Sequence, residues 1–127
     1  MEARQLFATV AERAGLSREE AADLTRSTAA ALAARLSGGA ARDLADRLPE
    51  PLAEGLRTGS PAVEKFGREE FVGRVSQHTG LTAEETTAGL RALLATLRDG
   101  MGADAFDQAV SQLPGDIREL ITPPDET

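Results

Sequence analysis

The residues whose types and spacing could do chemistry are two pairs of adjacent carboxylates, Glu19–Glu20 and Glu84–Glu85. Two carboxylates can act as general acid and general base when they converge on one cleft whose environment separates their pKa values. Adjacent residues on a helix point about 100° apart, because a turn holds 3.6 residues. The two members of each pair therefore do not face one substrate, and we expect no catalytic role for them.

A structural role fits both pairs better. Each pair lies in an S/T-x-x-E pattern, which is the sequence mark of a helix N-terminal capping box. The pattern predicts that Ser17 and Thr82 are N-caps and that Glu20 and Glu85 complete the two boxes. The preceding glutamate of each pair then lies near the positive end of the helix dipole.

DNA reading is the second candidate chemistry. Residues 7–26, FATVAERAGLSREEAADLTR, resemble the bihelical DNA-binding unit of LacI-type repressors, with the turn at Gly15. In such a unit the second helix enters the major groove. The residues that would then contact bases are Ser17, Arg18, Ala22 and Arg26. The flanks lack the Lys and Arg that supply most non-specific affinity for DNA, so we keep DNA binding as the alternative to a plain turn between two helices.

The composition disfavours metal and cofactor chemistry. The chain has one histidine, His78, and no cysteine. A transition-metal site normally gathers several such ligands, and neither an EF-hand loop nor a phosphate-binding P-loop pattern is present. We expect no catalytic residue, no metal and no cofactor, and we interpret His78 as a residue at the rim of a helix pair.

Two arginines occupy matching positions on the two longest expected helices. Arg26 is expected to pair with Asp23 or with an acid of a neighbouring helix, which is a structural role. The alternative is that Arg26 and Arg91 present related surfaces to a partner.

The elements that position these residues are set by an internal duplication. Shifting the sequence by 65 residues aligns residues 10–36 with 75–101 and residues 41–56 with 106–121, without a gap. A gapless register of this length predicts two copies of one structural unit. The identical pairs include Val10/Val75, Gly15/Gly80, Leu16/Leu81, Leu48/Leu113 and Pro49/Pro114.

Each copy reads as a helix, a tight turn, a long helix, a third helix and a short last helix. The apolar residues recur every three or four positions, and no stretch alternates with period two, so we expect no sheet. The first long helix is expected to span about residues 18–36 and to end at Gly38–Gly39, and its copy to end at Gly100 and Gly102. Proline after the third helix disfavours its continuation.

The ordered set of motifs resembles the DUF2267 family, small bacterial proteins of uncharacterised function. The residues that carry the resemblance are VAERAGLSREEA and LAARLSGGAARDLADRLPEPL, with their copies VSQHTGLTAEET and SQLPGDIRELI. The resemblance implies an all-helical duplicated fold and supplies no catalytic residue to carry over.

These patterns predict an all-α protein with two tandem pseudo-symmetric helical repeats packed into one compact bundle. Residues 1–127 form a single domain: repeat one at 1–57, a linker at 58–67, repeat two at 68–121 and a tail at 122–127. Because a unit of about fifty residues buries too little apolar surface alone, the repeats should share a core.

The net charge of −7 aids solubility and repels phosphate backbones. We expect a non-enzymatic cytoplasmic protein with no membrane span, acting as a protein-interaction or accessory module and in one version as a homo-oligomer. Its partner is unidentified, and nucleic acid is disfavoured. DNA binding through residues 7–26, or a helical pocket for a small apolar ligand, are the alternatives.

Overall fold

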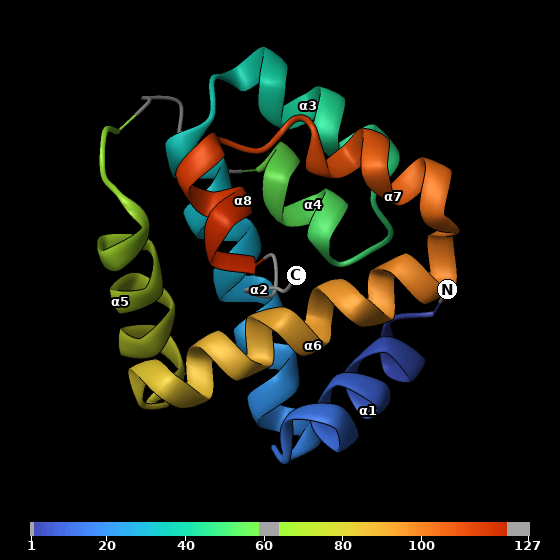
Figure 1. The fold of residues 1–127 in the computed structure, drawn as a ribbon, viewed down its shortest axis with the longest axis vertical. Coiled ribbons are helices and arrows are strands. Elements are labelled where there is room, and N and C mark those ends of the chain that lie inside the picture. The colour runs from blue at the N-terminus through green and yellow to red at the C-terminus, as the bar shows by residue number, and fades with distance from the viewer. Residues whose placement is uncertain (1, 59–63, 122–127) are drawn as a thin grey trace.

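The computed structural model describes residues 2–58 and 64–121, which fold into helices with no strand (Figure 1), so the all-α prediction is confirmed. The first half contains α1 (Ala3–Ala14), α2 (Arg18–Arg35), α3 (Gly38–Arg47) and α4 (Leu52–Arg57). The second half contains α5 (Arg68–Thr79), α6 (Ala83–Met101), α7 (Ala103–Val110) and α8 (Gly115–Ile121). Residues 59–63 of the predicted linker and the predicted tail at 122–127 lie outside the described residues.

Three of these helices end at a glycine that the sequence predicts as a helix end. Gly15 and Gly80 follow α1 and α5 with φ of 71° and 76°, a left-handed conformation that glycine adopts without strain. Gly102 ends α6 with φ of 91°, whereas Gly100, also expected at this end, lies within the helix.

The expected ending of α2 at Gly38–Gly39 is wrong. The helix ends at Arg35, because Leu36 adopts extended backbone and Ser37 begins the next helix. The Ser37 hydroxyl oxygen accepts a hydrogen bond from the Ala40 N–H at 3.2 Å, which makes Ser37 an N-cap. The two glycines are therefore the first residues of α3.

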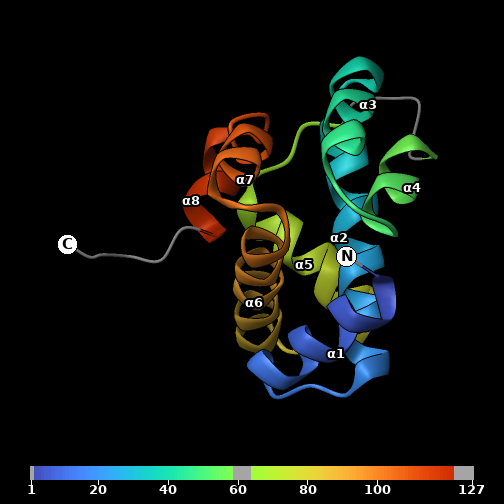
Figure 2. The same ribbon diagram turned by 90° about the vertical axis from the view of Figure 1, so that its right-hand side faces the viewer.

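The two halves pack reciprocally. α1 of the first half lies along α6 of the second, and α5 lies along α2 to the same extent. Figure 2 shows α2, α3 and α4 on one side of the molecule and α6, α7 and α8 on the other, with α1 beneath both. This exchange of partners is consistent with the predicted pair of pseudo-symmetric repeats, and buried residues of both halves form one core.

Leu24 and Gly89 meet where α2 contacts α6. The shift of 65 residues pairs these two positions, and a Cβ added at Gly89 would lie 2.9 Å from Leu24 Cδ1. A residue touches its own counterpart only near the axis that relates two copies. Two leucines would overlap at this point, so the glycine in the second half makes room for the leucine in the first.

The core is built of aliphatic side chains and a few threonines. The apolar stripes of α1 and α5 are buried at Leu6, Val10, Phe71 and Val75. The hydroxyls of the buried Thr25, Thr28 and Thr96 donate to carbonyls of their own helices, as where Thr28 donates to the Leu24 carbonyl at 2.7 Å. The hydroxyl of buried Thr86 instead pairs with Ser76 of α5 at 2.8 Å.

The two halves differ at their C-terminal helices. α4 packs on both α2 and α3, whereas α8 packs on α5 and α6 and leaves α7 without a comparable cover. Ala109 is the one buried residue of α7. The apolar face of α7 instead meets α3 across an open seam.

Candidate functional site

Both predicted capping boxes are present, and they use the carboxylates that could have been catalytic. Ser17 Oγ accepts from the Glu20 N–H at 3.0 Å, and Glu20 Oε1 accepts from the Ser17 N–H at 2.9 Å. Thr82 and Glu85 repeat the arrangement at 3.0 and 2.9 Å. These glutamates therefore satisfy backbone donors at helix starts.

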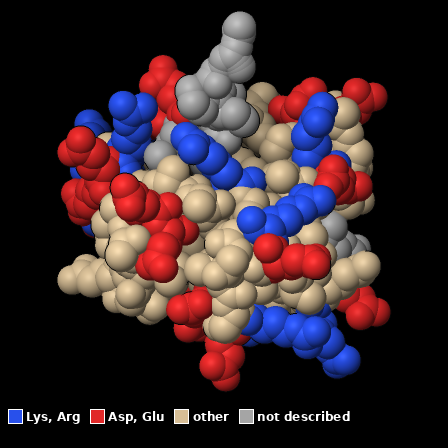
Figure 3. All heavy atoms as spheres, turned by 60° about the horizontal axis from the view of Figure 1, so that its bottom comes forward, with Lys and Arg blue, Asp and Glu red and all other residues tan. Residues whose placement is uncertain are grey.

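The segment that resembles a DNA-binding unit packs one face into the core and exposes the other. α2 contacts α1, α3, α4, α5 and α6, so it is the central helix of the bundle. Of the four proposed base-contacting residues, Ser17 serves as a cap, Ala22 is only 9% exposed, and Arg18 and Arg26 are exposed. On the face shown in Figure 3, Lys and Arg alternate with Asp and Glu and form no basic stripe.

The matching arginines have different surroundings. Among the described residues Arg26 pairs with no carboxylate, so the expected Arg26–Asp23 pair is absent; its guanidinium lies 5.5 Å from the centre of the Phe7 ring. Arg91 is exposed on α6 and lines a shallow depression with Ala83, Glu84, Thr87 and Ala88.

His78 lies exposed in the last turn of α5, where its Nδ1 is 2.9 Å from the Arg74 carbonyl oxygen. A polar contact of this kind is ordinary at a helix C-terminus. Within residues 2–58 and 64–121, no three acidic, histidine or cysteine side chains gather as metal ligands. No helix in that part of the chain combines the length and apolar character needed to span a bilayer.

An apolar groove, the first of two surface features suited to binding, runs between α3 and α4 on one side and α6 and α7 on the other. Its central cavity measures about 40 Å³. Leu48, Leu94 and Phe106 are half-buried in its walls. The groove is lined by Thr28, Leu32, Leu44, Leu48, Leu52, Leu93, Leu94, Leu97, Phe106, Ala109, Val110 and Leu113.

The rim of the apolar groove carries charge. Arg47 of α3 donates a hydrogen bond to Gln108 Oε1 of α7 at 3.1 Å, across the groove. α7 also carries Asp104 and Asp107, both exposed, and contains no Lys or Arg. The exposed charges of α7 are therefore all acidic.

Charged side chains stack around Phe66. The sequence did not predict this stack, because Phe66 lies in the predicted linker at 58–67. Phe66 is only 8% exposed, and the guanidiniums of Arg74 and Arg35 lie 3.9 and 5.8 Å from its ring centre. Arg74 also pairs with Glu64 at 2.7 Å and with Glu70 at 2.8 Å. The one sequence signal was an aromatic residue in a polar stretch just before a helix.

A second ion pair holds the last helix to this stack. Arg35 donates two hydrogen bonds to the Asp116 carboxylate, at 3.1 and 3.2 Å, and these bonds lower the pKa of Asp116. The hydrogen bond from Arg74 likewise lowers the pKa of Glu64. The stack thus joins α2, α5, α8 and the segment before α5.

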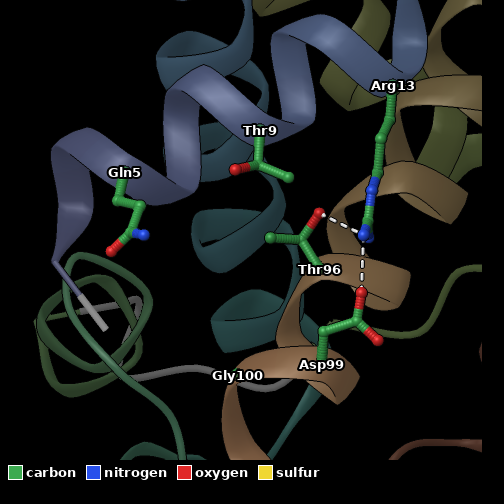
Figure 4. Close-up of a pocket in the computed structure, with 6 residues that line it drawn as sticks. All are labelled: Gln5, Thr9, Arg13, Thr96, Asp99 and Gly100. Carbon is green, nitrogen blue, oxygen red and sulfur yellow. Dashed lines mark hydrogen bonds and ion pairs between the residues drawn. The ribbon is translucent and has the colours of Figure 1, made fainter.

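A polar groove, the second surface feature, lies between α1 and α6 (Figure 4). In it Arg13 donates to Thr96 Oγ1 at 3.2 Å and forms an ion pair with Asp99. Its volume is about 410 Å³. It is lined by Gln5, Thr9, Arg13, Thr96, Asp99 and Gly100.

Comparison with known proteins identifies a family but no curated relative. No curated protein sequence gives a significant match to the chain. The family model described as an uncharacterized conserved protein, DUF2267, matches residues 3–120, which include all the helices from α1 into α8. The chain therefore belongs to the DUF2267 family.

Proposed function

We propose that this protein is a non-enzymatic interaction module that binds an amphipathic helix of a partner protein along the apolar groove. The observation that carries the proposal is a set of apolar side chains that are half-buried along that groove, above lining residues that belong to the core: Leu48, Leu94, Phe106, Val110 and Leu113. A continuous apolar strip on a folded surface is the feature that marks interaction sites. A helix with apolar residues three and four positions apart presents a matching strip.

The acidic charge of this chain suggests which residues the polar face of the partner helix carries. α7, which forms one wall of the groove, carries the exposed Asp104 and Asp107 and no basic residue, and the whole chain has a net charge of −7. Complementary charge speeds association and selects against wrong partners. We therefore expect basic residues on the solvent-facing side of the bound helix.

The size of the groove argues against a small apolar ligand as its occupant. Pockets for small molecules usually enclose about 300–1,000 Å³, and the cavity here is about 40 Å³. A partner helix needs no enclosed space, because it can cover half-buried side chains such as Phe106 and Leu94 from outside.

The position of α2 argues against the DNA-binding alternative. The helix that would enter the major groove is packed on five other helices. Ala22, one of the four residues that would contact bases, is buried. The acidic net charge also opposes approach to phosphates. A cytoplasmic location stays a prediction from the sequence.

The test is an affinity capture from a lysate of the organism that encodes the chain, followed by mass spectrometry. The bait is the full chain in three forms: wild type, Phe106→Asp in the apolar groove, and Ala95→Asp at an exposed position of α6. We expect one protein to be enriched by wild type and by the Ala95 variant, and to be lost about tenfold or more with Phe106→Asp, which corresponds to at least 1.4 kcal/mol.

Equal capture by all three forms, or enrichment of no protein, contradicts the proposal. Thermal unfolding of each variant establishes that a lost partner does not reflect an unfolded bait. Light scattering after gel filtration measures self-association. A dimer that Phe106→Asp dissociates would show that a second copy of the chain occupies the groove, and this result would overturn the binding of a separate partner.

A further inference from the structure

The central cavity of the apolar groove lies between equivalent positions of the two halves. The shift of 65 residues pairs residues of the first half that line the cavity with residues of the second half that also line it. Each half therefore contributes the same positions to the walls. The pairs are Thr28/Leu93, Leu32/Leu97, Leu44/Ala109 and Leu48/Leu113.

One of these pairs joins side chains of very different size. Leu44 of α3 is 1% exposed and Ala109 of α7 is 3% exposed, so both belong to the packed walls of the cavity. An isobutyl group lines the cavity from the α3 side, and only a methyl group lines it from the paired position on α7. The small side chain of Ala109 thus leaves open the space that a leucine at this position would take.

The lining of the cavity is unsuited to water. The cavity measures about 40 Å³, and a water molecule needs about 10–15 Å³ of accessible volume, so size does not exclude it. A buried water also needs roughly two to four polar partners. Among the described residues that line the cavity, Thr28 has the one polar side chain, and its hydroxyl already donates to the Leu24 carbonyl at 2.7 Å. The lining therefore favours an apolar occupant.

The cavity can be reached from the surface of the groove. Phe106, Val110 and Leu113 on the α7 side and Leu48 on the α3 side line it and are only half-buried. A helix that lies on these residues covers the cavity and can direct one side chain into it. Interfaces concentrate their binding energy in a few side chains that fill such dry pockets.

We propose that the central cavity binds one aliphatic group of about leucine size, and that this group is the anchor side chain of the partner helix. The size follows from Leu44, which holds the paired position in the first half. The assignment of the anchor rests on the proposed function, whereas the binding of an aliphatic group in the cavity does not.

The first part of the test uses xenon and the full chain with ¹³C-labelled methyl groups, because dry apolar cavities bind xenon. We expect the methyl signals of Leu44 and Leu97 to shift with rising xenon pressure until they saturate. Ala109→Leu fills the cavity and should weaken xenon binding about tenfold or more. Ala95→Leu makes the same change at an exposed position of α6 outside the lining, and should bind xenon as wild type does.

The second part repeats the lysate capture with the same two variants. The partner that Phe106→Asp loses should also be lost, about tenfold or more, with Ala109→Leu, because the filled cavity no longer admits the anchor. It should be retained with Ala95→Leu. Thermal unfolding establishes that each variant is folded, and Ala109→Val, which adds less volume, replaces Ala109→Leu if the larger side chain overpacks the site.

The outcomes separate this proposal from the proposed function. Xenon shifts that do not saturate, or equal xenon affinity in wild type and Ala109→Leu, overturn the cavity as a binding site. A partner that is lost with Phe106→Asp but retained with Ala109→Leu overturns the anchor and leaves the proposed function standing. Saturable xenon binding together with capture of no partner supports the cavity site, and it overturns the proposed function and the anchor with it.

Discussion

At the scale of single residues, Phe66 is expected to contribute to stability although it lies in a polar stretch of the sequence. It is buried between two guanidiniums although it lies outside every helix. We expect Phe66→Ala to lower the free energy of unfolding by about 3 kcal/mol, from lost burial and cavity formation. Phe66→Leu, which keeps the apolar volume but not the ring, should cost about 1 kcal/mol. Urea denaturation measures both, and an unchanged free energy of unfolding for Phe66→Leu would exclude a contribution from the ring face.

Asp116 gives a pH-dependent prediction at the same scale. Hydrogen bonds from Arg35 lower its pKa in the folded protein, so the ion pair adds stability above the unfolded pKa of about 3.9. That stability is lost as the pH falls through the folded value. Asp116→Asn should cost about 0.5 kcal/mol at pH 7, since the pair is partly exposed.

The measurement is the thermal midpoint at pH 7 and near pH 2.5, with Asp43→Asn at an exposed position of α3 as the control. The difference between wild type and Asp116→Asn should shrink at the lower pH. A difference that is the same at both values would show that the charge of Asp116 does not contribute.

At the scale of helices, replacing two glycines by alanine distinguishes the effect of helix propensity on stability from the effect of packing. Gly73 lies exposed in α5 with open space around it, so Gly73→Ala should stabilise by about 0.5–1 kcal/mol. Gly55 lies in α4, where an added Cβ would be 2.7 Å from Ala29 Cβ of α2. Gly55→Ala should therefore destabilise by about 1–3 kcal/mol, because neither backbone can give way cheaply. Denaturant midpoints measure both, and the same sign for the two changes would contradict the observed contact of α4 with α2.

At the scale of the whole molecule, the exchange of partners between halves predicts that neither half folds alone. A fragment of residues 1–58 lacks α6, along which α1 packs, and a fragment of residues 64–127 lacks α2, along which α5 packs. Isolated helices of these lengths are marginal in water. We expect each fragment to show little helical circular dichroism at 222 nm, and an equimolar mixture to regain it. Cooperative thermal unfolding of either fragment alone would show that the core is not shared.

The sequence predicted those features that depend on a few neighbouring residues. The capping hydroxyls of Ser17 and Thr82 and the turn glycines Gly15 and Gly80 hold the places that their local patterns assign. The expected role of Gly38 was wrong, since a glycine pair after a helix reads equally well as an end or as the first turn of the next helix. Ser37 decides between them by capping α3.

The sequence by itself determined the helical class and the starts of the two long helices at Ser17 and Thr82. These follow from side-chain spacing and from hydrogen bonds that span three or four residues. Only the tertiary structure decided that α1 lies on α6 while α5 lies on α2. It also decided that Phe66 lies between the guanidiniums of Arg74 and Arg35, and that α8 leaves α7 bordering an apolar groove. Such features depend on which faces meet across long separations in the chain, and equal local patterns in the two halves cannot specify unequal partners.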